Sequence, residues 1–266
     1  IGVDEHKTSE ITTSGDIIDI DTLENYVFDD GNALNSFNHF NVYEGKIVNL
    51  NLSSETVNLI NLVHNSATNI DGTLNSIKNS DIGGNIYFLN PHGIMIGKTG
   101  VVNVGSLTAV TPTQDFMDNI FTSPGDIKQE KILQIAEDIT AGKIPVTETG
   151  LISVKGEINA IEDIELKAAE VIVDGSNEGR GILITDADYS SDSESGNNTD
   201  KVDFSNVVNI NGVPAAGEEV VFENGEIIIT AESGEGTEAA VDINEANIIA
   251  ENIKINVESG LKENNY

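Results

Sequence analysis

The chain has 266 residues, with 45 Asp and Glu against 13 Lys and Arg, a formal charge of -32, and no cysteine. This charge excludes binding to nucleic acids and to anionic membranes, both of which require basic side chains that face phosphate. The missing cysteines exclude disulfides and thiolate metal sites, and with only 5% aromatic residues the core must consist of Ile, Val, Leu and Ala, as in stacked strands.

The N-terminal residues show no sign of a targeting segment. The first four residues (IGVD) contain neither a basic n-region nor an apolar h-region. No apolar run approaches the length of about 18 residues that a transmembrane helix needs. We therefore expect that a signal peptide has been removed or that the chain never had one.

Short apolar runs separated by Gly, Asn and Asp begin at Asp16. The first two alternate between apolar and polar residues, which predicts β-strands. The later ones end at Asn-Pro, Gly or Gly-Ser, which predicts short strands joined by tight corners. The runs lie at residues 17–20, 46–52, 86–89, 94–96 and 101–104.

One segment in the middle of the chain has helical instead of strand periodicity. Ile132, Ile135, Ala136 and Ile139 recur at helical spacing. Ser123 followed by Pro124 is a suitable cap and first turn, and Lys143 ends the pattern. We predict a helical excursion that covers a flank of the strand stack.

The second half of the chain has the most regular pattern, with apolar runs every six to seven residues. This spacing is shorter than the 8–12 residues typical of sandwich strands. It fits a solenoid in which three strands and three corners form one rung. Asn159 and Asn209 either form ladders inside such a solenoid or lie in exposed turns. The runs lie at 151–154, 157–160, 164–166, 171–173, 227–229, 241–243, 248–249 and 253–255.

The stretch 186–200 is acidic, of low complexity and free of bulky aliphatic residues. Such a composition predicts a loop that leaves the solenoid. Its oxygen-rich side chains could bind Ca²⁺, but they lack the spaced Gly and the terminal bidentate Glu of an EF-hand loop. A flexible loop is therefore the preferred interpretation, and no cofactor is otherwise expected.

Residues 85–113 closely resemble the signature of two-partner-secretion (TPS) domains. That signature is an apolar strand, Asn-Pro-Asn-Gly-Ile, a second short strand, Gly-Lys, and a rung of the type Val-Asn-Val-Gly. His92 replaces the usual second Asn. The matching signature residues are Asn90, Pro91, Gly93, Ile94, Gly97, Asn103 and Gly105.

Segments on either side extend the resemblance from about Asp16 to Val173. Phe37, Phe40 and Asn41 lie in a stretch similar to the aromatic-x-x-Phe-Asn-Val segment of the family, and residues 150–156 resemble the rung that follows its extra-helical excursion. The Asn-Pro-Asn-Leu motif of the filamentous-haemagglutinin branch is absent around 59–71, which suggests the branch of high-molecular-weight adhesins.

The resemblance implies an all-β fold: a right-handed parallel β-helix with an N-terminal β cap and extra-helical excursions. It implies one secretion domain over 1–266. Within it we place the cap and first rungs, the signature rungs, a helical or loop excursion, and a regular β-helix that includes the acidic loop. These parts span 1–50, 51–122, 123–145 and 146–266.

The same resemblance implies a function in export. A TPS domain is recognised in the periplasm by an outer-membrane β-barrel transporter with periplasmic repeat domains, and it seeds β-helix folding outside the cell. The exoprotein is then secreted or held at the surface of a Gram-negative bacterium, and a host receptor or glycan would contact the rest of the exoprotein.

The signature corner also has a physical role of its own. Pro91 fixes its own φ and pushes Asn90 into an extended conformation that ends the strand. Gly93 can adopt the positive φ that reverses the chain. The Asn90 side chain can hydrogen-bond to the backbone that follows it. We therefore predict a β-turn that sets the register between rungs.

Two other classes of function remain open from the residues alone. Many β-helices are polysaccharide lyases or glycosidases, and the only arginine, Arg180, is a candidate lyase base. The carboxylates are too numerous to pair by sequence, and His6, His39, His64 and His92 lack metal-ligand spacing.

An adhesin module is the third class. Scattered Phe and Tyr offer no aromatic platform for sugars, so we expect adhesion to lie outside this segment. Residues 261–266 form no amphipathic capping helix, and an uncapped coil would expose strand edges. We therefore expect the chain to be part of a longer protein.

Overall fold

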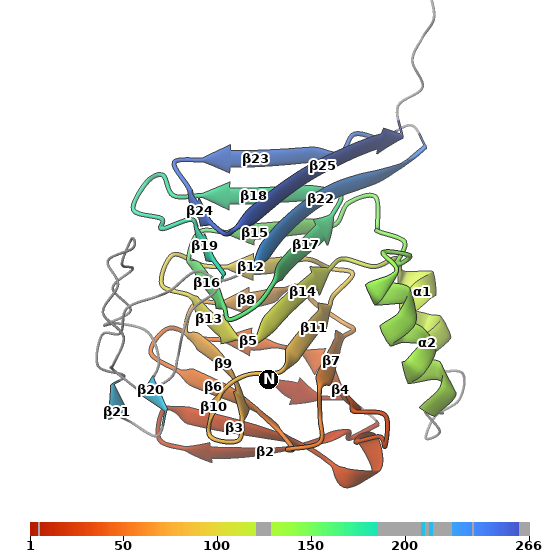
Figure 1. Cartoon of the computed structure of the whole chain (residues 1–266), viewed down its shortest axis with the longest axis vertical. Coiled ribbons are helices and arrows are strands. Elements are labelled where there is room, and N and C mark those ends of the chain that lie inside the picture. The colour runs from red at the N-terminus through yellow and green to blue at the C-terminus, as the bar shows by residue number, and fades with distance from the viewer. Residues whose placement is uncertain are drawn as a thin grey trace, which may run out of the picture.

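Parallel strands stacked in three sheets form the body of the chain (Figure 1). The computed structural model describes residues 1–4, 6–120, 129–185, 209–210, 213–214, 225–235 and 237–260. Successive strands pass from the first sheet to the third and then to the second, and the chain then returns to the first sheet one level higher. This is the predicted parallel β-helix.

The first sheet has eight strands, and only its N-terminal strand is antiparallel to its neighbour. Its strands, in spatial order, are β1 (Gly2–Val3), β4 (Asn32–His39), β7 (Asn58–Val63), β11 (Asn85–Leu89), β14 (Ser106–Val110), β17 (Ile164–Ala168), β22 (Glu226–Glu235) and β25 (Asn252–Gly260).

The second sheet has nine strands, and an antiparallel hairpin forms its N-terminal end. Its strands are β2 (Ser9–Ser14), β3 (Ile17–Thr22), β6 (Ile47–Leu52), β9 (Thr73–Lys78), β10 (Asp81–Ile82), β13 (Val101–Val104), β16 (Glu157–Ala160), β19 (Ile182–Ile184) and β24 (Asn247–Ile249).

The third sheet has six parallel strands. They are β5 (Asn41–Val42), β8 (Thr68–Ile70), β12 (Ile94–Ile96), β15 (Leu151–Val154), β18 (Glu170–Asp174) and β23 (Ala240–Asn244). Outside the three sheets lie the short helix η1 (Glu24–Tyr26) and the antiparallel pair β20 (Asn209–Ile210) and β21 (Val213–Pro214).

An N-terminal β cap begins the coil, as predicted. The β2–β3 hairpin pairs antiparallel, and β3 then pairs parallel with β6. Strand β1 runs antiparallel to β4. The antiparallel strands β1 and β2 thus pair with the backbone N–H and C=O groups that β4 and β3 would otherwise expose at the edge of the first rung.

Two helices lie on the outer face of the first sheet (Figure 1). They are α1 (Gln114–Ile120) and α2 (Gln129–Thr140), inserted between β14 and β15. The predicted helical face is confirmed, because Ile132, Ile135 and Ile139 are buried against outward-facing residues of the sheet and Ala136 packs partly buried beside them. These sheet residues are Leu34, Ile60, Leu62, Leu89 and Val110.

The helical excursion begins earlier than the sequence predicts, within the stretch assigned to the signature rungs. Thr113 caps α1, since its hydroxyl oxygen accepts a hydrogen bond from the Phe116 amide at 3.3 Å. The predicted cap at Ser123 and Pro124 lies outside the described residues. No helix of the described ranges is both long and apolar enough to cross a membrane.

A column of buried asparagines runs along the outer face of the second sheet, since their neighbours in each strand, such as Val102 and Val104, point into the core. Asn49, Asn75, Asn103 and Asn159 are at most 4% exposed. Each side-chain amide donates to the side-chain oxygen of the rung below at 2.9–3.0 Å, beginning with Asn49 on Asp19. Asn159 therefore belongs to a ladder and not to an exposed turn, but the ladder lies on the outer face and not inside the solenoid. The side chain of Asn209 lies outside the described part of the chain. We call these four asparagines the amide column.

Replacing Asn103 by Leu should destabilise the protein by about 2–4 kcal/mol. The change leaves the Asn75 side-chain oxygen without a donor and one N–H of the Asn159 amide without an acceptor, and each buried unsatisfied group costs roughly 1–3 kcal/mol. Urea unfolding followed by circular dichroism measures the difference. Asn51→Ala is the matched control, since Asn51 bonds Asp21 in an exposed pair on the same sheet, and its effect should stay within about 0.5 kcal/mol. Equal effects of the two variants would contradict a stabilising column.

Candidate functional site

The corner between β11 and β12 is a hydrogen-bonded β-turn of the predicted kind. The Gly93 amide donates to the Asn90 carbonyl oxygen at 3.2 Å. The His92 amide donates to the Asn90 side-chain oxygen at 2.9 Å, and Gly93 has a φ of 104°. Pro91 occupies the second position of the turn, where its fixed φ is favourable. The turn predicted from these four residues is therefore present.

The Asn90 side chain also connects the corner to the rung below. It is fully buried, and its amide nitrogen lies 2.9 Å from both the Ser66 carbonyl oxygen and the Thr68 hydroxyl. The Gly93 carbonyl oxygen accepts a hydrogen bond from the Thr68 amide at 3.0 Å. One side chain therefore satisfies the corner and fixes its position on the preceding rung.

His92 lies where the family has a second Asn, and its side chain is also used between rungs. One ring nitrogen lies 2.7 Å from the His64 carbonyl oxygen. Because a carbonyl oxygen only accepts hydrogen bonds, that nitrogen must carry the proton. The exposed imidazole therefore hydrogen-bonds to the preceding rung on the outer side of the corner, whereas Asn90 contacts the same rung from its buried side.

The aromatic residues of the upstream motif lie in the core beneath the signature strand. Phe37 and Phe40 are fully buried, and their ring centroids are 5.2 Å apart in an edge-to-face arrangement. Phe40 makes a second edge-to-face contact, at 5.1 Å, with Phe88 of β11. Asn41 instead forms an exposed pair with Asn69. The motif thus supports β11 from two rungs below, since β7 lies between β4 and β11.

The other signature residues lie around the same rung, away from the corner. Ile94 is buried in the core, and Asn103 belongs to the amide column. At Gly97 a Cβ atom would come 1.8 Å from the Asp71 carboxylate, and at Gly105 it would come 2.5 Å from the Gly84 carbonyl oxygen. The structure therefore distributes the signature around one complete rung and does not gather it into a single patch.

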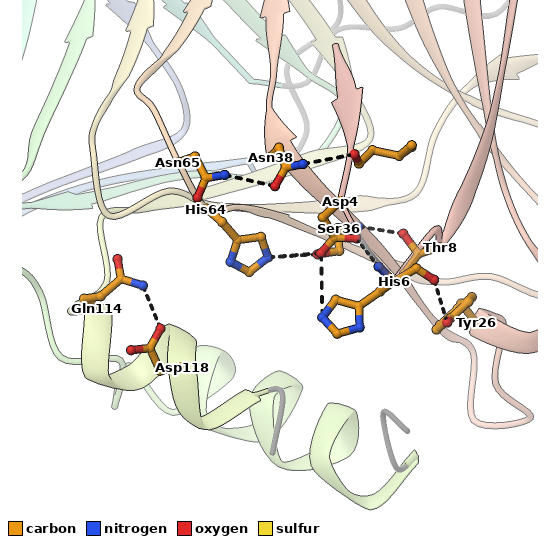
Figure 2. A network of polar contacts seen from close by, with 11 residues as sticks. Asp4, His6, Thr8, Tyr26, Ser36, Asn38, His64, Asn65, Gln114 and Asp118 are labelled. Carbon is orange, nitrogen blue, oxygen red and sulfur yellow. Dashed lines mark hydrogen bonds and ion pairs between the residues drawn. The ribbon is translucent and has the colours of Figure 1, made fainter. Parts of the chain in front are cut away.

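A polar cluster near the N-terminus contains functional candidates that the sequence pattern did not reveal. His6 and His64 both approach the Asp4 carboxylate, and Ser36 bonds to it (Figure 2). Burial lowers the pKa of His64 from its ordinary value of 6.5. A usable signal was the recurrence of Ser36, His64 and His92 at intervals of 28 residues.

Neither a metal centre nor a lyase base emerges from the part of the chain that the structure describes. No group of three or more His, Asp or Glu side chains in those ranges could hold a metal ion. The Arg180 guanidinium lies 2.6 Å from the Glu157 carboxylate and also donates to the Gly100 carbonyl oxygen. Its hydrogen bonds therefore hold neighbouring rungs together. The acidic loop 186–200, where calcium was considered, lies outside the described residues.

Comparison with known families identifies the family of the chain as a whole. The family model of the TPS secretion domain matches residues 2–258. The chain belongs to the TPS secretion-domain family. No curated protein matches it. Seven chains of solved structures do, among them the HMW1 secretion domain from Haemophilus influenzae. That match has 17% identity and a TM-score of 0.37, and it covers 92% of this chain and 57% of the other.

Membership of this family defines the role of the chain in general terms. A TPS domain is a secretion module and not an enzyme, so the lyase and glycosidase interpretation is set aside. Domains of this family in general belong to secreted exoproteins and act with an outer-membrane transporter.

Replacing Gly93 by Ala should destabilise the TPS domain by about 2–4 kcal/mol. A φ of 104° is unfavourable for any residue with a Cβ, and the new Cβ would lie 2.9 Å from the Leu151 carbonyl oxygen. Gly45→Ala is the matched control, because Gly45 has a φ of 75° and a Cβ added there would meet nothing within 4 Å; its cost should be about 1 kcal/mol. Chemical unfolding of both variants tests this, and similar losses would contradict the close packing of the corner.

Proposed function

We propose that this TPS domain crosses the periplasm unfolded and is recognised there by the periplasmic repeat domains of its β-barrel transporter. The chain then reaches the outside of a Gram-negative cell, where it is released or stays at the surface. We further propose that the signature rung, residues 85–105, is the segment that links recognition to folding, because its corner is also a register-setting element.

The buried contacts of Asn90 are the observation that supports this proposal. Its single side chain bonds the following turn and two groups of the preceding rung. These contacts span 22 to 24 residues along the chain. These contacts can form as soon as the corner follows the preceding rung out of the cell. The coil can therefore fold one rung at a time as export proceeds.

The two stages use the same segment in different ways. While unfolded, the short alternating strands can add to an exposed sheet edge of the transporter's periplasmic domains. Outside the cell, burial of Ile, Val and Leu side chains and formation of the parallel ladder favour the folded coil. Folding on one side of the membrane then opposes backward sliding, in the absence of a nucleotide at the outer membrane.

Contact of the exoprotein with a host receptor or glycan is proposed to lie outside this domain. Among the large apolar side chains of the described residues, Tyr43 is the exposed aromatic one, at 68%. A single exposed ring offers no extended stacking platform for a sugar chain.

Replacing Asn90 by Ala should lower secretion about tenfold when the chain is co-expressed with its transporter, if loss of these contacts raises the folding barrier by roughly 1.4 kcal/mol. The secreted fraction is measured by comparing medium and cells, and the refolding rate of the purified variant is measured by stopped-flow fluorescence or circular dichroism. Asn69→Ala, which removes an exposed inter-rung pair, is the matched control and should be secreted normally.

The two halves of the proposal fail separately. A variant that refolds slowly yet is secreted at the normal rate would contradict folding as the directional bias. A variant that refolds normally and remains in the cell would contradict the folding role of Asn90 and support its role in recognition by the transporter. Secretion of the wild-type chain without any transporter would contradict the proposal as a whole.

A further inference from the structure

The N-terminal segment, residues 1–8 with residue 5 outside the described part, is held on the first rung by polar contacts around Asp4 (Figure 2). Strand β1 pairs with β4, and the Asp4 amide donates to the Ser36 carbonyl oxygen at 3.4 Å. The Ser36 amide in turn donates to the Thr8 hydroxyl at 2.7 Å. The Asp4 carboxylate accepts hydrogen bonds from the Ser36 hydroxyl and from the His6 amide. Asp4 is only 7% exposed, so its charge depends on these donors.

The direction of the hydrogen bonds in this cluster follows from what each group can do. An ionised carboxylate only accepts, so Ser36 must donate its hydroxyl proton to Asp4. The Ser36 oxygen then accepts from the His64 Nε2 atom, which lies 2.8 Å away. His64 therefore carries a proton on Nε2, and burial of the ring favours the neutral form, without a second proton on Nδ1. The chain of donors runs from the second rung through the first rung to the N-terminal segment.

His64 is surrounded by titratable groups from two other elements. Asp4 and His6 face it from the N-terminal segment. The Nε2 atoms of His64 and His6 lie 3.7 and 3.9 Å from the same Asp4 carboxylate oxygen. Asp118 faces it from α1, and Gln114 holds that carboxylate at 2.8 Å. These side chains line a cavity of about 610 Å³ between the coil and the helix.

Burial has the largest effect on the proton affinity of His64. It lowers the pKa of the imidazole, and His6 lowers it further, whereas Asp4 and Asp118 raise it. The side chain is 18% exposed. A second proton on this ring would place a cation in a largely desolvated position, which the closed arrangement disfavours.

We propose that Asp4, Ser36 and His64 form an N-terminal latch that holds residues 1–8 on the first two rungs at neutral pH and releases them in acid. The latch is a property of the folded chain, and it does not depend on how the signature rung is recognised during export. It adds a reversible, proton-sensitive contact to an otherwise continuous stack of strands.

The sign of the pH effect follows from linkage. The open segment exposes His64, which then has its ordinary pKa of 6.5, whereas the closed latch binds the proton more weakly. As the pH falls below that value, protons favour the open form, and the opening constant rises by up to about tenfold per pH unit. The rise ends once the pH is below the pKa of the closed form.

Hydrogen exchange of the wild-type chain at about pH 7.5 and about pH 5 tests the latch, after correction for intrinsic exchange rates. The Asp4 and Lys7 amides, which are bonded in the closed form, should show several-fold more opening in acid. Amides of the inner strands β13 and β16 should show no such change. His64→Gln removes the titration and should make opening of residues 1–8 independent of pH in this range.

Two further variants separate the latch from a general effect of acid. His92→Gln removes an exposed imidazole on the same corner column and should retain the wild-type pH dependence. Ser36→Ala interrupts the chain of donors and should increase opening at both pH values. Persistence of the wild-type pH dependence in His64→Gln would overturn the proposal. So would an NMR titration of the wild-type ring that places the pKa of His64 at or above 6.5, even if the variants failed to fold.

Discussion

In-register pairing between successive rungs is the constraint on which the rest of the structure depends. Parallel strands whose inward residues are nearly all aliphatic could pair in more than one register, because a shift of two residues keeps the same face inside. The amide column removes this freedom. A shift would place a buried amide against an aliphatic side chain and leave two polar groups without partners, at a cost of roughly 1–3 kcal/mol each.

The column also has a defined polarity. It begins at the Asp19 carboxylate, which only accepts, so the Asn49 amide must point its nitrogen toward the N-terminal end of the coil. Each higher asparagine repeats this orientation, and Asn159 at the top donates both to Asn103 and to the Glu157 carboxylate. Because acceptors close both ends, one amide oxygen is left over. It is the buried Asn159 oxygen, which has no hydrogen-bond partner among the residues that the structure describes.

Local sequence patterns predicted the strands that have tight corners and the turn that joins two of them, and they failed where tertiary contacts decide the structure. β7 has buried side chains on both faces because the helices cover the outer one, so it shows no clean alternation and was not predicted. α1 was missed because Thr111, Pro112 and Thr113 resemble the end of the signature segment.

The turn at Asn90 is local and could be predicted, whereas its bonds to Ser66 and Thr68 depend on the pitch of the coil. The contact of Asp4 with Ser36, 32 residues apart, depends on an antiparallel first strand that no periodicity revealed.

The insertions in the coil occur at corners, and this placement explains how a long excursion leaves the register intact. Strand β14 pairs with β17 and β12 pairs with β15 in unbroken parallel ladders, although α1 and α2 lie between β14 and β15 in the chain. Lengthening a surface connection costs little, since closure entropy grows only with the logarithm of loop length. Each rung therefore makes its register-setting contacts with the rung before it, mostly 26 to 28 residues away, whatever the chain does between them. A coil of this kind can be completed from its N-terminal cap upward, which is the order in which an exported chain would present its rungs.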